Sequence, residues 1–266
     1  MPELPEVETI ARSLRPELTS RAIQSARLLW RRTLVIPSPE DFARQIDGRE
    51  IIGVERRAKY LDIQLSDLHL FIHLRMSGDL YMRPLPYLPE KHDRLVLELS
   101  DGCALVFNDP RKFGRVWLTA RPEDVIGSLG PEPFDPAFTP QELYNRLLRY
   151  RRQLKPLLLD QSFLAGLGNI YADEALHLAG LHPMRISDTI TLDESARLYH
   201  AIQTVLMAGI EHNGASIDWV YRGGNFQNHF RAYGREGKPC PRCGAPIERL
   251  IVGQRSTHIC SQCQVK

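Results

Sequence analysis

The first residues of the chain, Met1-Pro-Glu-Leu-Pro-Glu6, bring one amine and two carboxylates together in a short stretch. Pro2 has a small side chain, so the initiator Met1 is a good candidate for removal, which would leave a free secondary amine. A terminal α-amino group has a pKa of about 7.7–8.0, so a useful share of it is unprotonated at neutral pH. Such an amine can attack an electrophilic sugar carbon and form an iminium, with Glu3 or Glu6 as general acid or base.

A plain helix start explains the same residues, because Pro and Glu are both favoured in a first helical turn. The periodicity that follows predicts an amphipathic helix from about Pro5 to Leu18. Its apolar positions are Leu4, Val7, Ile10, Leu14 and Leu18. This helix would bury one face close to Pro2 and hold the amine in place, so both interpretations stay open on this stretch alone.

Four of the five cysteines form two knuckles, Cys240-x-x-Cys243 and Cys260-x-x-Cys263, sixteen residues apart. Repeated spacing of this kind predicts one structural Zn²⁺ held by four thiolates, with no open position for water. The alternative is four unrelated thiols. The residues between the knuckles read as a β-hairpin, from Ile247–Ile251 and Thr257–Cys260, with Arg255 near its tip. The fifth cysteine, Cys103, lies in an apolar strand and is expected in the core.

Composition gives the protein class rather than its function. With 266 residues, 43% hydrophobic and 25% charged, the chain has room for about two domains and a sizeable core. The formal net charge is only +2, but Arg222–Lys266 holds eight Lys/Arg against two Glu and no Asp. This basic tail fits an anionic partner.

We expect a cytoplasmic protein, because the N-terminus has no apolar signal core and no apolar run approaches the length of a membrane span. In a reducing compartment the clustered cysteines favour metal over disulfides.

Hydrophobic patterning divides the chain into a β-rich first half and a helical second half. Alternating segments predict strands, joined by one strong hairpin signal at Asp101-Gly102, in Ile51–Leu65, Leu68–Leu74, Arg94–Leu99 and Cys103–Phe107. Arg83–Asp93 reads as a long loop, and the proline-rich Gly130–Pro140 as an interdomain linker. Helices are then predicted after capping boxes at Thr139 and Thr191, and in Leu154–Asp160 and Ile170–Ala179.

Several further stretches suggest contacts with phosphate, each beside a simpler explanation. Lys59 opens an apolar strand, where an exposed edge lysine is the simpler interpretation. Asp109-Pro-Arg-Lys-Phe-Gly114 places basic side chains around an aromatic, as in a loop that wedges into a base stack, or as in any surface turn. Gly166-x-Gly168-Asn169 could point backbone N–H groups at a phosphate from a helix start. The basic run from Arg146 to Lys155 is typical of a solvated face.

Taken together, these stretches resemble bacterial formamidopyrimidine-DNA glycosylase, the bifunctional repair enzyme for oxidised purines. The resemblance runs along nearly the whole chain. It rests on Pro2-Glu-Leu-Pro-Glu-Val-Glu-Thr9, Arg57-Ala-Lys-Tyr60, His73-Leu-Arg-Met-Ser-Gly78, Lys91-His-Asp93, Asp109-Pro-Arg-Lys-Phe-Gly114, Leu129-Gly-Pro-Glu-Pro133, Leu158-Leu-Asp-Gln161, Gly168-Asn-Ile-Tyr-Ala-Asp-Glu174 and the two knuckles. It implies an α+β protein with a two-sheet β-sandwich (1–130), a helix–two-turn–helix domain (131–228) and a zinc ribbon (229–266).

The resemblance also implies roles for single residues in base excision repair. Pro2 resembles the nucleophile that attacks C1′, and Glu3 the acid that assists opening of the sugar ring. Lys59 matches a lysine that contacts phosphate and takes part in β-elimination, and Arg255 an arginine that supports δ-elimination. Met76, Arg111 and Phe113 match side chains that fill the gap left by the flipped base. The positions of His92, Arg111, Arg151 and Asn169 are those of DNA contacts.

The implied partner is double-stranded DNA with an oxidised base or an abasic site, bound by a monomer that needs no cofactor beyond one zinc ion. One departure concerns the loop Tyr221-Arg-Gly-Gly-Asn-Phe226, which looks several residues shorter than the lesion-capping loop of the family. Two competing classes are an endonuclease VIII-type glycosylase for oxidised pyrimidines and a non-catalytic zinc-ribbon DNA-binding protein. The Pro-Glu-Leu-Pro start and the Arg-Lys-Phe segment favour the purine enzyme.

Overall fold

The computed structural model describes residues 1–216 and 223–266 and divides into two compact units. The first unit is built chiefly from Met1–Pro2 and Glu6–Ser128, and the second from Glu3–Pro5, Leu129–Ala215 and Gly224–Lys266. Of the loop Tyr221–Phe226, Tyr221 and Arg222 lie outside the described residues. No described helix combines the length and apolarity that crossing a membrane requires.

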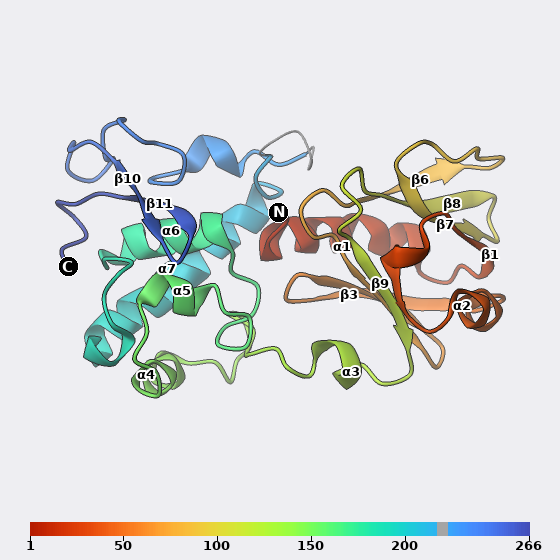
Figure 1. The fold of residues 1–266 in the computed structure, drawn as a ribbon, viewed down its shortest axis with the longest axis horizontal. Coiled ribbons are helices and arrows are strands. Elements are labelled where there is room, and N and C mark those ends of the chain that lie inside the picture. Colours follow the sequence, from red (N-terminus) through yellow and green to blue (C-terminus); the bar gives the residue numbers. More distant parts are fainter. Residues whose placement is uncertain (217–222) are drawn as a thin grey trace. The chain divides into compact units, whose positions relative to one another are not determined.

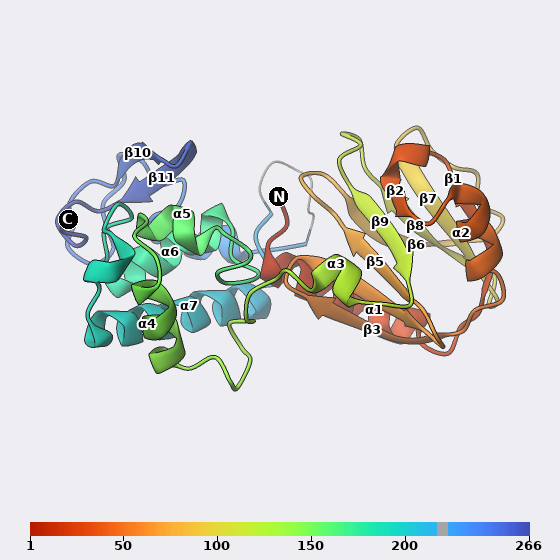
Figure 2. The ribbon, with the colours of Figure 1, turned by 60° about the horizontal axis from the view of Figure 1, so that its bottom comes forward.

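The first unit is a two-sheet β-sandwich with helices at its margins (Figures 1 and 2). One sheet has the order β1-β7-β8-β6, and the other has the order β2-β9-β5-β4-β3. The strands are β1 (Ile23–Leu28), β2 (Leu34–Ile36), β3 (Ile51–Arg57), β4 (Tyr60–Leu65), β5 (His69–His73), β6 (Asp79–Pro84), β7 (Asp93–Leu99), β8 (Cys103–Asn108) and β9 (Arg115–Thr119). The helices are α1 (Leu4–Leu18), α2 (Pro39–Ile46) and the single turn α3 (Glu123–Ile126).

The core of this unit forms because α1 and α2 each bury one apolar face together with the inner faces of the sheets. Val7, Ile10, Leu14 and Leu18 of α1 belong to one buried cluster with side chains from both sheets. The predicted amphipathic helix and the β7–β8 hairpin at Asp101-Gly102 are therefore confirmed. The prediction for Cys103 was wrong. It opens β8 and is partly exposed.

The second unit consists of helices and the C-terminal hairpin. The helices are α4 (Pro140–Leu148), α5 (Leu154–Leu158), α6 (Asn169–Ala179) and α7 (Leu192–Glu211), and the hairpin strands are β10 (Glu248–Val252) and β11 (Arg255–Ile259). Thr191 forms a complete capping box with Glu194 at the start of α7. Between α5 and α6 the chain makes two turns. The side chain of Gln161 braces them through the carbonyls of Leu159 and Leu167 and the N–H of Gly166.

Candidate functional site

The carboxylate of Glu3 is fixed by the start of helix α6. Its oxygens accept hydrogen bonds from the backbone N–H groups of Gly168 (2.7 Å), Ile170 (2.9 Å) and Tyr171 (3.4 Å). The first turn of a helix offers N–H groups that have no intrahelical partner, and the helix dipole favours a negative group there. Glu3 is only 2% exposed. Pro2, which is also buried, is thus joined directly to an anchored residue.

The two glycines before α6 give the N-terminal segment the space that it needs. A Cβ on Gly168 would overlap the Glu3 carboxyl group, and a Cβ on Gly166, where φ is +96°, would lie 2.6 Å from Leu4 Cδ1. The Leu4 N–H also donates to the Gly166 carbonyl at 3.1 Å. Of the N–H groups that the sequence suggested for a phosphate, that of Gly168 binds Glu3 and that of Gly166 binds the Gln161 side chain, so the suggestion was wrong for these two.

Lys59 lies in the turn between β3 and β4, directly after Ala58, whose φ is +54°. The lysine is 4% exposed, so the simpler interpretation of an exposed edge lysine was wrong. The strand that leads into this turn is tied to α1 by an ion pair between Arg56 and Glu8 at 2.9 Å. The strand that leads to Lys59 is thus braced by the helix that begins beside Pro2.

His73 ends β5 next to this turn and is kept neutral by its surroundings. Burial, and after it the positive charges of Arg75 and Lys59, lower the pKa of His73 to about 3. Its neutral Nδ1 accepts the N–H of Arg75 at 3.0 Å, which fixes the turn that carries Met76. The Met76 side chain is 43% exposed, unusual for a large apolar residue beside a core strand.

Asp109 holds together the loops that carry the other candidate DNA-contacting residues of the first unit. Its carboxylate, which is buried, accepts the Ser77 hydroxyl and the N–H groups of Arg111 (3.1 Å) and Gly114 (2.7 Å). Its N–H donates to the carbonyl of His92 at 2.9 Å. Asp109 therefore positions Arg111 and the turn after Met76 through its carboxylate, and His92 through its backbone N–H.

Phe113 projects from the same Asp109–Gly114 turn and is 46% exposed. The guanidinium of Arg111 lies over its ring, 4.9 Å from the centroid. An exposed aromatic ring covered by a cation presents an apolar wedge with positive charge beside it, which is the chemistry of a side chain inserted between base pairs.

Backbone strain marks the candidate residues. Six non-glycine residues in the described chain have positive φ, and four of them adjoin a candidate. The four pairs are Ala58 with Lys59, Arg75 with Met76, Lys112 with Phe113 and Gln254 with Arg255. Such conformations are uncommon outside glycine and cost about 1–3 kcal/mol each where they occur, and they gather at functional sites.

A buried ion pair joins α5 and α6 to the hairpin that carries Arg255. Lys155 and Asp173 are both fully buried, with Nζ 2.5 Å from Oδ1. Lys155 also donates to the Ser256 carbonyl and the Thr257 hydroxyl, and Asp173 accepts the N–H of His258 at 2.9 Å. The prediction of a solvated face for the whole basic run was wrong here. Arg151, four residues earlier, is exposed as predicted.

Asn169 completes this arrangement from the first turn of α6. Its side-chain amide donates to the Ser256 carbonyl at 3.0 Å, next to Arg255. Arg255 is exposed and begins β11, directly after the turn at Gly253-Gln254. The second unit therefore assembles Glu3, Asn169 and Arg255 around the start of α6, and the first unit assembles Lys59, Met76, His92, Arg111 and Phe113.

The four cysteine sulfurs meet as the knuckle spacing predicts. The ligand atoms of Cys240, Cys243, Cys260 and Cys263 all lie within 4.8 Å of one another, with one pair at 3.4 Å and another at 3.9 Å. A tetrahedral zinc site with Zn–S bonds of about 2.3 Å has S···S edges of about 3.8 Å. The donor set thus fits one Zn²⁺, and with four protein ligands the ion is structural.

We expect Cys260→Ser to release the zinc and weaken binding to any DNA duplex, while the first unit stays folded. The hairpin has little apolar core of its own, so the metal supplies much of its folding free energy. Metal analysis and a DNA titration check this prediction, with Cys103→Ser as the control that should change neither. Full zinc content and unchanged DNA affinity in Cys260→Ser would contradict it.

Sequence reasoning missed the buried groups that position the candidates, namely Asp109, Asp173 and the burial of Lys155. Each is a charged residue whose type alone does not indicate burial, and only its contacts show what it does. The positive-φ conformations could not be predicted from the sequence either, because Arg75 and Lys112 are residue types that seldom adopt them.

Comparisons with known proteins cover the whole chain. Three family models match, described as the formamidopyrimidine-DNA glycosylase N-terminal domain (residues 1–116), its H2TH domain (129–220) and a zinc finger found in FPG and IleRS (237–265). Two curated relatives, both formamidopyrimidine-DNA glycosylases, are 50% identical (Chloroflexus aggregans; 100% of this chain, 99% of the relative) and 48% identical (Herpetosiphon aurantiacus; 99% and 100%).

Solved structures similar to this chain include DNA complexes. The Lactococcus lactis enzyme bound to DNA with an abasic site has a TM-score of 0.92 at 35% identity, covering 99% of this chain and 100% of that one. A MutM complex with DNA that contains carbocyclic 8-oxo-G has a TM-score of 0.92 at 36% identity, with full coverage of both chains. These matches favour the purine glycosylase over the endonuclease VIII-type glycosylase and over the non-catalytic zinc-ribbon DNA-binding protein.

Proposed function

The chain belongs to the formamidopyrimidine-DNA glycosylase family and is a base excision repair glycosylase for oxidised purines, and we propose that its attacking group is the secondary amine of Pro2. Once Met1 is removed, this amine attacks C1′ of the damaged nucleotide. The bond from C1′ to the base breaks and its electron pair leaves with the base. As the bond to C1′ forms, the N–H proton of Pro2 passes to the Glu3 carboxylate, which gives it to the ring oxygen as the sugar opens. Pro2 is then left joined to the sugar as an iminium.

The anchoring of Glu3 supports this proposal most directly. Three backbone N–H groups hold the carboxylate at the start of α6, and a single peptide unit separates it from the amine of Pro2. A positioned acid next to a nucleophile is the arrangement that covalent catalysis with ring opening requires. Glu6, the second carboxylate of the stretch, is buried on α1 and has no assigned step.

Strand cleavage follows from the same intermediate. An iminium acidifies the C2′ proton, whose removal expels the 3′ phosphate in β-elimination, and a second elimination expels the 5′ phosphate. We assign Lys59 to the phosphate beside the lesion and to β-elimination, and Arg255 to phosphate and δ-elimination. The burial of Lys59 and the fixed hairpin of Arg255 suit groups that must hold one position.

The remaining candidates hold the DNA. We assign His92, Arg111, Arg151 and Asn169 to backbone contacts, which position a duplex without reading its sequence. Met76 and Phe113 fill the space left when the base leaves the stack, a step that costs a few kcal/mol. The three parts 1–130, 131–228 and 229–266 then serve as catalytic domain, helix–two-turn–helix domain and zinc ribbon. We place this monomeric enzyme in the cytoplasm, on chromosomal DNA.

Borohydride trapping tests the proposed nucleophile. Reduction of the iminium fixes the protein to DNA that contains 8-oxoguanine, and mass spectrometry of the linked peptide identifies the amine. We expect the link at Pro2, and no trapping by protein that retains Met1, because its Pro2 nitrogen is then a tertiary amide. A link at Lys59, or trapping by the Met1-containing form, would overturn the assignment.

Phe113→Ala and Met76→Ala should slow excision from an intact lesion duplex more than cleavage at a preformed abasic site. Both side chains are exposed on the turns around Asp109, and an abasic site has no base to flip. Single-turnover rates on the two substrates give the comparison. Leu88→Ala, at an 85% exposed apolar residue of another loop, serves as the control. Equal losses on both substrates would argue against the wedge role.

A further inference from the structure

Helix α6 contacts the zinc-ribbon segment through polar side chains spaced four residues apart. Asn169 bonds the Ser256 carbonyl and Asp173 the backbone of His258, and the next position on the same face is His177. Its Nε2 lies 3.3 Å from the sulfur of Cys240. Residues at i, i+4 and i+8 share one helix face, so the stripe leads from the start of α6 to the metal knuckle.

We propose that His177 is a positioning residue of the zinc site, whose Nε2–H donates a hydrogen bond to the thiolate of Cys240 and thereby retains the metal. This inference goes beyond the proposed catalytic roles and does not depend on them.

The geometry favours this direction of the hydrogen bond. His177 is 2% exposed and Cys240 is 3% exposed, so water does not compete for the contact. Nδ1 has no hydrogen-bond partner in the described part of the chain, which leaves Nε2 as the ring nitrogen that faces an acceptor. The Cys240 sulfur also receives the backbone N–H of Arg242 at 3.4 Å from within the knuckle. His177 adds a second donor from outside the zinc ribbon.

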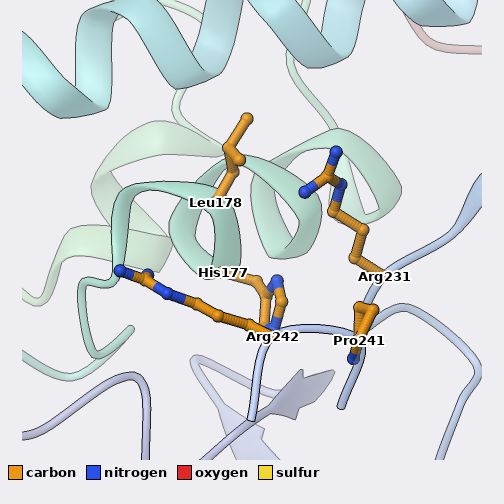
Figure 3. Close-up of a pocket in the computed structure, with 5 residues that line it drawn as sticks. All are labelled: His177, Leu178, Arg231, Pro241 and Arg242. Carbon is orange, nitrogen blue, oxygen red and sulfur yellow. The ribbon is translucent and has the colours of Figure 1, made fainter.

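Charge gives a reason for the donor. One Zn²⁺ with four thiolates carries a net charge of about −2, which a buried site must offset with hydrogen-bond donors and nearby cations. Figure 3 shows the Arg242 side chain extending on one side of His177, with Pro241 and Arg231 on the other. Both arginines line the same pocket as His177, and neither forms an ion pair with a carboxylate of the described residues.

The ring also controls access to the sulfur. His177 lines a pocket of about 440 Å³ together with Leu178, Arg231, Pro241 and Arg242. The same ring contacts Cys240, so a smaller or non-donating side chain would expose that thiolate to solvent and to chelators. Residues that hydrogen-bond a metal ligand without binding the metal themselves typically change metal affinity by about 10–100-fold when they are replaced.

The test compares zinc release from the full-length protein into an excess of a chromogenic chelator. His177→Phe keeps a ring of similar size and loses the donor, and His177→Gln puts an amide N–H at nearly the same reach as Nε2. His200→Phe, at an exposed histidine on α7, is the matched control. We expect release about 10-fold faster for His177→Phe, a rate close to that of the unsubstituted protein for His177→Gln, and no change for His200→Phe.

Three results would overturn the proposal. The first is release at the unsubstituted rate by folded His177→Phe. The second needs no variant: the ring ¹⁵N signals of the zinc-loaded protein report which nitrogen of His177 carries the hydrogen. The Nε2–H tautomer supports the proposal, whereas a hydrogen on Nδ1 alone excludes donation to Cys240, even if His177→Phe does not fold. Equal acceleration in His177→Phe and His177→Gln would show that packing, and not the donor, retains the metal.

Discussion

Glu3→Gln should slow excision of 8-oxoguanine by about 10²–10⁴-fold, the usual contribution of a positioned acid or base. Glutamine has nearly the same size but cannot give up a proton to the opening sugar. The substitution also puts an NH₂ group in place of one of the two oxygens that accept backbone N–H groups at the start of α6. Cleavage at a preformed abasic aldehyde should suffer less, because that sugar is already open. The affinity for DNA should not change, because Glu3 is not assigned to a phosphate contact.

Single-turnover kinetics on the two substrates measure this prediction. Glu17→Gln, at an exposed glutamate near the end of α1, is the matched control and should behave like the unsubstituted protein. Excision by Glu3→Gln within a few-fold of normal would refute the assignment. An equal loss on both substrates would instead indicate that the displaced amide disturbs the start of α6.

Lys155→Met should destabilise the second unit by about 3–5 kcal/mol, the cost of removing one partner from a buried ion pair. The substitution leaves the Asp173 carboxylate fully buried, with His258 as its remaining partner among the described residues. The Thr257 hydroxyl and the Ser256 carbonyl each lose the lysine donor, and the carbonyl keeps the Asn169 amide. Denaturant unfolding followed by a probe in this unit gives the free energy of unfolding. The hairpin that carries Arg255 should lose its position at the same time, with a loss of strand cleavage.

Arg152→Met supplies the contrast, because its ion pair with Asp160 is partly exposed and such pairs contribute about 0–1 kcal/mol. The double variant Lys155→Met/Asp173→Leu should recover part of the loss, since no unpaired charge then remains in the core. A loss below 1 kcal/mol for Lys155→Met, or a double variant that is less stable than the sum of the single ones, would contradict this view.

Local patterns predicted the elements that carry the candidates. The helix periodicity after Leu4, the capping residues Thr139 and Thr191 and the repeated Cys-x-x-Cys spacing depend on neighbours in the sequence, and the structure shows each of them. Strand prediction was less complete. β2 has three residues and pairs in parallel with β9. It is too short to show the alternation of apolar and polar residues that predicts a strand. β6 extends to Pro84, where the sequence indicated a loop from Arg83.

The positions of the candidates were not predictable from spacing, because their partners are far away in the sequence. Glu3 bonds residues that lie 165 to 168 positions further on, and Lys155 bonds the hairpin about 100 positions later. In the sequence Lys155 looks like the rest of its basic run. Only the opposing charge of Asp173, supplied by another helix, makes its burial possible.

The four-residue stripe on helix α6 limits how this gene can change. Each added residue turns the rest of a helix by about 100°. A one-codon insertion between Asn169 and Asp173 would swing Asp173 and His177 away from the zinc ribbon together, although it would remove no side chain. Length variation should therefore be absent from α6.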